Sequence, residues 1–177
     1  MKHISPRELA YCGMLGAAAL LLPILFHLVH LGSAFMPMVL PLCVLPFFVR
    51  PLPAATTAAL VPLLSGALTG MPPFFPPVAL FMSIELAVMT TIIAFIVRRW
   101  PKVNEWLALI PVLLLGRAVY AALVYGCSLV IDLPAGVVAG MSLLRGLPGL
   151  VLITVVVPPV ARLRRRMARN ELVRAKK

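Results

Sequence analysis

Three charged residues lie inside long apolar stretches, and their side chains are the ones best suited to binding chemistry. Glu85, Arg117 and Arg145 each interrupt such a stretch. In a lipid bilayer, an ionised side chain at this depth costs roughly 3 kcal/mol or more unless it is paired or faces water. One interpretation is a structural ion pair between Glu85 and one arginine. The other is a polar cavity with one surplus positive charge, suited to a ligand carboxylate that a guanidinium grips with two parallel hydrogen bonds.

Two histidines end the first apolar stretch. His27 and His30 have i, i+3 spacing and therefore occupy neighbouring positions on one helix face. They are interpreted as markers of the helix end, as a ligand-binding pair or as part of a metal site. A metal normally needs three or four ligands, and few others are near, so no metal site is predicted. Cys12, Cys43 and Cys127 are far apart and are interpreted as small buried hydrophobes.

Two expected loops are apolar and rich in proline. Residues 31–37 read LGSAFMP and residues 70–77 read GMPPFFPP. Proline stiffens a loop, and stiff apolar loops suit a lid over an organic ligand, with Phe35, Met71 and Phe74 as its walls. The alternative is a loop that dips into the membrane interface.

No enzyme motif is present. The sequence has no nucleotide-binding loop, no HExxH and no GxSxG. We therefore expect no catalytic residues, no cofactor and no direct use of ATP.

The composition predicts how these residues are positioned. The 177 residues are 62% hydrophobic and only 12% charged. A soluble domain of this size has too little interior to bury that much apolar surface, whereas lipid can cover it. The basic residues are dispersed between apolar stretches or gathered in a tail, which argues against a nucleic-acid partner. The prediction is an all-α membrane protein, a single transmembrane domain over residues 1–177 with a basic cytoplasmic tail over about 161–177.

Six segments are long or apolar enough to be proposed as membrane helices, each needing about 20 residues to cross. The second is short and crowded by prolines, so it is expected to be a short, tilted or broken helix. The six segments are Leu9–His30, Met38–Val49, Pro53–Thr69, Val78–Val97, Trp106–Val130 and Pro134–Val160.

The distribution of positive charge predicts the orientation. With the N-terminus inside, fourteen of the sixteen lysines and arginines fall on the inner side, and the outer connections contain none. This asymmetry indicates that both chain ends are cytoplasmic and supports an even number of crossings.

Small residues on the first helix offer a close-packing surface. Gly13 and Ala17 form a small-xxx-small pair, which allows another helix to approach. The pair serves either internal packing or docking of a partner membrane protein.

Taken together, these features resemble the substrate-binding S components of energy-coupling factor (ECF) vitamin transporters, over about Leu9–Arg166. The resemblance rests on chain length, the Gly13 and Ala17 pair, HLVHLGSAFMPM (27–38), SGALTGMPPFFPP (65–77) and Glu85 in the fourth segment. It implies a protein of the bacterial inner membrane that captures a small vitamin-like molecule from outside. It also implies docking on a membrane coupling protein that carries two ATPase subunits, with the basic tail near lipid head groups.

The predicted substrate-binding residues are His27, His30, Phe35, Met71, Phe74, Glu85, Arg117 and Arg145, and the predicted docking residues are Gly13 and Ala17. Two other functions remain open. A scaffold of a cell-envelope complex predicts no outward cavity and arginines paired by the protein itself. A metal-uptake subunit predicts that the two histidines converge with a third ligand.

Overall fold

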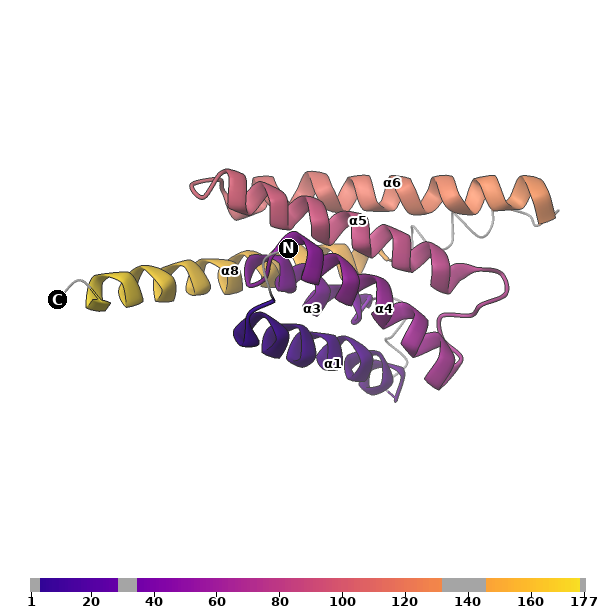
Figure 1. Cartoon of the computed structure of the whole chain (residues 1–177). Helices are drawn as coiled ribbons and strands as arrows, with labels where there is room; N and C mark the ends of the chain where they lie inside the picture. Colours follow the sequence, from indigo (N-terminus) through magenta and orange to yellow (C-terminus); the bar gives the residue numbers. More distant parts are fainter. Residues whose placement is uncertain (1–3, 29–34, 132–145, 176–177) are drawn as a thin grey trace.

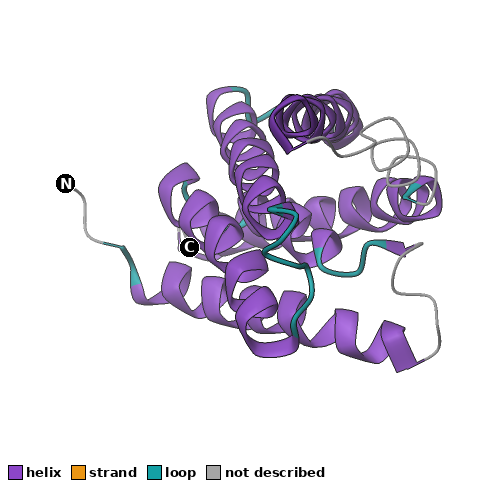
Figure 2. Cartoon of the chain, turned by 90° about the vertical axis from the view of Figure 1, so that its right-hand side faces the viewer, coloured by secondary structure: helices purple, strands orange, loops and turns teal. Residues whose placement is uncertain are grey.

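A computed structural model of the chain describes residues 4–28, 35–131 and 146–175. Within these ranges the protein is helical and contains no strand, so the all-α prediction is confirmed there (Figures 1 and 2). The elements are α1 (Pro6–Leu28), α3 (Val39–Val44), the 3₁₀ turn η1 (Leu45–Phe47), α4 (Pro51–Thr69), α5 (Val78–Arg99), α6 (Glu105–Ile131) and α8 (Leu147–Ala175).

Local sequence signals explain where these helices begin and end. Ser5 and Glu8 form a capping box, in which the Ser5 hydroxyl accepts from the Glu8 amide at 3.2 Å and the Glu8 carboxylate accepts from the Ser5 amide at 3.2 Å. Proline occupies the first position of α4, where its missing amide hydrogen is not needed. Gly70, at φ 74°, ends α4 in the left-handed conformation that favours glycine.

Five of the described helices are long and apolar enough to cross a membrane, and they correspond to the first, third, fourth, fifth and sixth predicted segments. The second predicted segment does not form such a helix. Its helical part, α3 with η1, spans Val39–Phe47 and has a length of about 13 Å, less than half of the hydrocarbon core. Pro41 and Pro46 lie within it and remove amide donors, which is the physical reason for the break.

The longer stretch over residues 35–50, of which α3 and η1 are the helical part, nevertheless runs along most of the bundle. At one end, the Phe35 ring lies 6.1 Å from that of Phe26 in α1. At the other end, Arg50 forms an ion pair with Glu8 at the start of α1. Glu8 and Phe26 are 18 residues apart on α1, about 27 Å along the helix. Leu42, Cys43 and Leu45 are fully buried, so neighbouring helices surround the broken backbone, as an interrupted segment at membrane depth requires.

The last helix continues far beyond the predicted segment. α8 extends to Ala175, so most of the basic tail expected after Val160 is an extension of the helix, which projects past the other helices (Figure 1). Arginine, alanine, methionine and leucine dominate this stretch and all favour helix. The start predicted at Pro134 lies outside the described residues.

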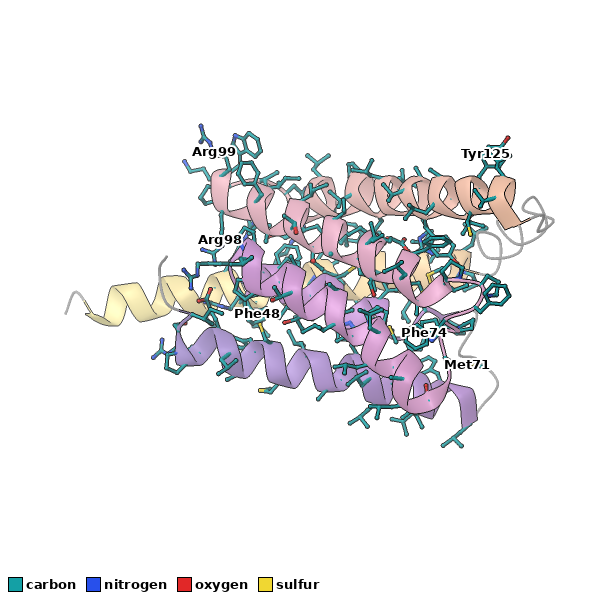
Figure 3. All side chains as sticks on the ribbon, turned by 45° about the vertical axis from the view of Figure 1, so that its right-hand side comes forward. Phe48, Met71, Phe74, Arg98, Arg99 and Tyr125 are labelled. Carbon is teal, nitrogen blue, oxygen red and sulfur yellow. The ribbon has the colours of Figure 1, made fainter. Side chains whose placement is uncertain are left out.

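The two ends of the bundle differ in chemistry. At one end, ion pairs join the first turn of α1 to the start of α4 and the end of α5, and join the start of α6 to α8. We name this the basic end. Figure 3 shows Arg98 and Arg99 there, and Met71, Phe74 and Tyr125 at the opposite, apolar end.

The loop at the apolar end is held against α4. The Ser65 hydroxyl donates to the Met71 carbonyl at 2.7 Å, and the Ala79 amide donates to the Pro73 carbonyl at 3.0 Å. Gly66 makes this possible, because a Cβ atom there would lie 2.7 Å from the Pro72 carbonyl oxygen and 3.0 Å from the Phe74 ring. Residues 70–77 are therefore a fixed connection, as their prolines predicted.

Replacing Gly66 by alanine is expected to destabilise the protein by about 1–3 kcal/mol, although alanine favours helix, because backbone atoms of the loop must move. Gly13→Ala is the matched control, since a Cβ at Gly13 has no atom within 4 Å. It should be neutral or stabilise by up to about 1 kcal/mol. Unfolding of the detergent-solubilised variants measures both changes, and equal effects would contradict the assigned loop contact.

Candidate functional site

Glu85 and Arg117 meet in the apolar interior between α5 and α6. Glu85 lies on the inward face of α5 with Ser83, Leu86 and Met89, and its side chain is fully buried. An ion pair joins its Oε1 to Nη2 of Arg117, whose side chain is 11% exposed. α5 and α6 run in opposite directions, so residues near the middle of both helices come to the same level. The structure brings together these two of the predicted site residues.

Gly116 allows α5 and α6 to approach beside this pair. A Cβ atom at Gly116 would overlap the Met89 sulfur, and Met89 is only 1% exposed. Met89 follows Glu85 by one helical turn, so the tight contact and the ion pair are neighbours on the same interface. The missing side chain of Gly116 therefore helps to set the distance across which the ion pair forms.

A second group also holds Arg117. Its guanidinium carbon lies 5.6 Å from the centroid of the Tyr120 ring, one turn further along α6, and Tyr120 is 5% exposed. A cation over an aromatic face is attracted by the ring quadrupole. Arg117 is thus partnered by protein groups, and the interpretation of Glu85 as the partner of one arginine is confirmed for Arg117. Arg145, the second arginine predicted within the apolar stretches, lies outside the described residues.

The predicted wall residues lie at the apolar end. Phe35 is partly buried and packs its ring on Phe26. Met71 and Phe74 are 59% and 53% exposed, so much of their apolar surface faces away from the protein. The Phe74 ring also lies over Gly66, which ties it to α4. Met71 and Phe74 are therefore half exposed at this end rather than enclosed.

The histidine predictions are not tested by the structure. His27 belongs to the backbone of α1, but its side chain is outside the described part of the chain, as is the whole of His30. Among the described residues, no three histidine, cysteine, aspartate or glutamate side chains gather as metal ligands.

Gly13 and Ala17 lie on the exposed side of α1. A Cβ at Gly13 would meet no atom within 4 Å, whereas one at Gly16 would lie 3.3 Å from the Thr57 side chain in α4. Ala19 is fully buried. Internal packing therefore uses Gly16 and Ala19, and the interpretation of Gly13 and Ala17 as internal packing residues is wrong. The described part of the chain leaves their face uncovered.

Glu8 forms an arginine-rich cluster that the sequence interpretation missed. Its carboxylate accepts from the Arg50 amide at 2.9 Å and pairs with the Arg50 guanidinium at 3.0 Å. Arg98 approaches it to 3.9 Å. This one carboxylate therefore joins α1, α4 and α5. The Ser-x-x-Glu capping box before α1 was a signal for a helix start, but nothing local identified the two arginines.

Glu105 forms a second arginine cluster on the other side of the basic end. Its carboxylate lies 3.1 Å from Nε of Arg162 and 3.2 Å from Nη1 of Arg165. Nη1 of Arg165 also donates to the Val103 carbonyl at 2.9 Å. The start of α6 is thereby fastened to α8. Both glutamates flank the apolar stretches, and no local pattern in the sequence identifies their arginine partners, which lie on other elements.

Searches of family models, of curated proteins and of solved structures found no match to this chain.

Proposed function

We propose that this chain is the substrate-capture subunit of a bacterial ECF-type uptake transporter. In this proposal it crosses the inner membrane six times, binds a small vitamin-like molecule at its outer side and docks on a coupling protein with two ATPase subunits. The transport energy comes from those ATPases, because the capture subunit itself serves only to bind and deliver.

The six crossings follow from five long helices and a sixth, broken passage over residues 35–50. The ends of that passage are held near Phe26 and Glu8, and its middle is buried. The basic end is assigned to the cytoplasm, because lysine and arginine accumulate on the cytoplasmic side of membrane proteins. Both chain ends are then cytoplasmic, and the apolar end with Met71 and Phe74 faces outward.

The observation that carries the proposal is the open small-residue face of α1. Gly13 and Ala17 are exposed, and nothing in the described structure occupies the space beside Gly13. α1 is also the least buried of the five long helices. Small residues allow two helix backbones to approach closely within a membrane, so this face suits the coupling protein.

The substrate site is assigned to the outward half of the bundle. Glu85 lies about 10 Å below the start of α5, and the pair with Arg117 leaves guanidinium donors for a substrate carbonyl or carboxylate. His27, His30 and Arg145 complete the polar part of the proposed site, and Phe35, Met71 and Phe74 supply its apolar rim.

A second candidate function is a scaffold subunit of a cell-envelope complex. The Glu85–Arg117 pair favours it, because a purely structural protein needs its buried charges neutralised by its own groups. In that case the open face of α1 binds a structural partner, and no small molecule is required.

A ligand screen separates the two functions. The purified protein is melted in the presence of single vitamins and nucleobases. A captured substrate at ~100 times its dissociation constant should stabilise the folded protein by about 2.7 kcal/mol. A screen without any shift would count against transport and leave the scaffold.

Docking is tested by Gly13→Leu. The variant should bind substrate normally, lose co-purification of the two ATPase subunits and lose substrate uptake by cells. Gly126→Leu on α6 is the matched control, because a Cβ there also meets no atom within 4 Å. If both variants retain uptake, the proposed docking face is refuted.

A further inference from the structure

The basic end carries more positive charge than its own carboxylates neutralise. Among the residues whose side chains the structure describes, Glu8 and Glu105 supply the carboxylates there, and each already engages two arginines. The cations described at this end are Arg7, Arg50, Arg98, Arg99, Lys102, Arg162, Arg164, Arg165 and Arg166. The protein therefore leaves a positive surface for an external anion.

Arg164 is the cation best prepared to bind one. Its guanidinium carbon lies 5.7 Å from the centroid of the Phe48 ring, and Phe48 packs on Tyr11 with ring centroids 4.8 Å apart. This aromatic support holds the guanidinium against α1 and η1. The side chain as a whole is partly exposed, whereas its Nε is buried and has no acceptor among the described residues.

The next residue has a similar unused donor. Nη1 of Arg165 is engaged by Val103 and Glu105, but its buried Nη2 has no acceptor in the described part of the chain. A buried donor without an acceptor is destabilising. Two successive side chains of α8 are thus held by neighbouring elements while some of their donors stay unmet.

The side chains around Arg164 suit the binding of a lipid head group. Leu163 and Met167 flank it on α8 and are 54% and 53% exposed, which offers apolar surface for an acyl chain. At the same end, Trp100 is 54% exposed and Arg99 lies 5.8 Å from its ring. Tryptophan is enriched at the interface between the hydrocarbon core and water, which suits a position of this end near the head groups.

We propose that Arg164, together with Arg165, binds the phosphate of an anionic phospholipid on the cytoplasmic side of the protein. A planar guanidinium matches two phosphate oxygens with paired hydrogen bonds, and the adjacent leucine and methionine receive an acyl chain. The site depends on the protein being embedded in a membrane and is independent of the transported substrate.

The test compares thermal stability in nanodiscs of phosphatidylcholine with that in nanodiscs containing phosphatidylglycerol. The native protein should melt at a higher temperature with phosphatidylglycerol, and Arg164→Gln should lose most of this shift. Arg166→Gln removes the same charge from an exposed position two residues away and should retain it. Equal losses in both variants would refute a defined site in favour of diffuse attraction.

Two further arms sharpen the result. Phe48→Leu keeps every charge but removes the aromatic support of Arg164, so the difference between the two lipids should shrink. An unchanged difference in this variant would overturn the proposed geometry. Inorganic phosphate added to phosphatidylcholine nanodiscs should give no comparable shift, and a full shift would refute the lipid as the ligand.

Discussion

Replacing Glu85 by alanine is expected to lower the free energy of unfolding by about 3–5 kcal/mol, the cost of breaking a buried ion pair by removing one partner. The carboxylate is fully buried and Arg117 is 11% exposed. Without Glu85, the guanidinium keeps its charge, because arginine remains protonated in proteins. Among the described side chains, no other carboxylate pairs with Arg117. Reversible unfolding in mixed detergent micelles measures the loss.

A double variant tests whether the loss comes from the uncompensated charge. Glu85→Gln combined with Arg117→Met removes both charges and should restore much of the stability, because an uncharged replacement of a buried pair is often neutral. Ser83→Ala is the control on the same helix, since its hydroxyl donates only to the Ala79 carbonyl. A double variant as unstable as Glu85→Ala would contradict this explanation. If the chain is a transporter, the double variant should regain stability without regaining substrate binding.

Replacing Gly116 by alanine is expected to cost about 1–3 kcal/mol through overpacking. The new methyl group would overlap the Met89 side chain, which is 1% exposed. The helices must separate or Met89 must change rotamer, and either change disturbs the adjacent ion pair. Gly126→Ala on the same helix is the control, since that position is open. Denaturant titration of both variants gives the comparison.

Shortening Met89 should relieve this overlap. Met89→Ala alone leaves a cavity and is expected to cost about 2–5 kcal/mol. Combined with Gly116→Ala, the total loss should fall short of the sum of the single losses by about 0.5–3 kcal/mol, the usual coupling of residues in contact. Strict additivity in this double-mutant cycle would show that the two residues do not meet in the native protein.

Four of the five long helices could be predicted from the sequence within a few residues, and the exception is α8, which continues to Ala175. The expected segments Pro53–Thr69 and Val78–Val97 correspond to α4 (Pro51–Thr69) and α5 (Val78–Arg99). A run of apolar residues long enough to cross a bilayer must satisfy its backbone hydrogen bonds internally, so hydropathy alone indicates a helix. The second segment was harder to predict, because its prolines break the helix and only its burial among neighbours allows it to persist.

For the candidate site, the residue types could be predicted from the sequence, but their contacts could not. The sequence by itself determined that Glu85, Arg117 and Arg145 are exceptional, because a charged residue inside a long apolar stretch is recognised from the residue types alone. Only the tertiary structure decided that Glu85 belongs to Arg117, and that Gly13 and Ala17 remain exposed while Gly16 packs inside. It also revealed the arginine partners of Glu8 and Glu105. Each of these contacts joins two or more helices, and their relative rotation and depth are set by the packing of the whole bundle.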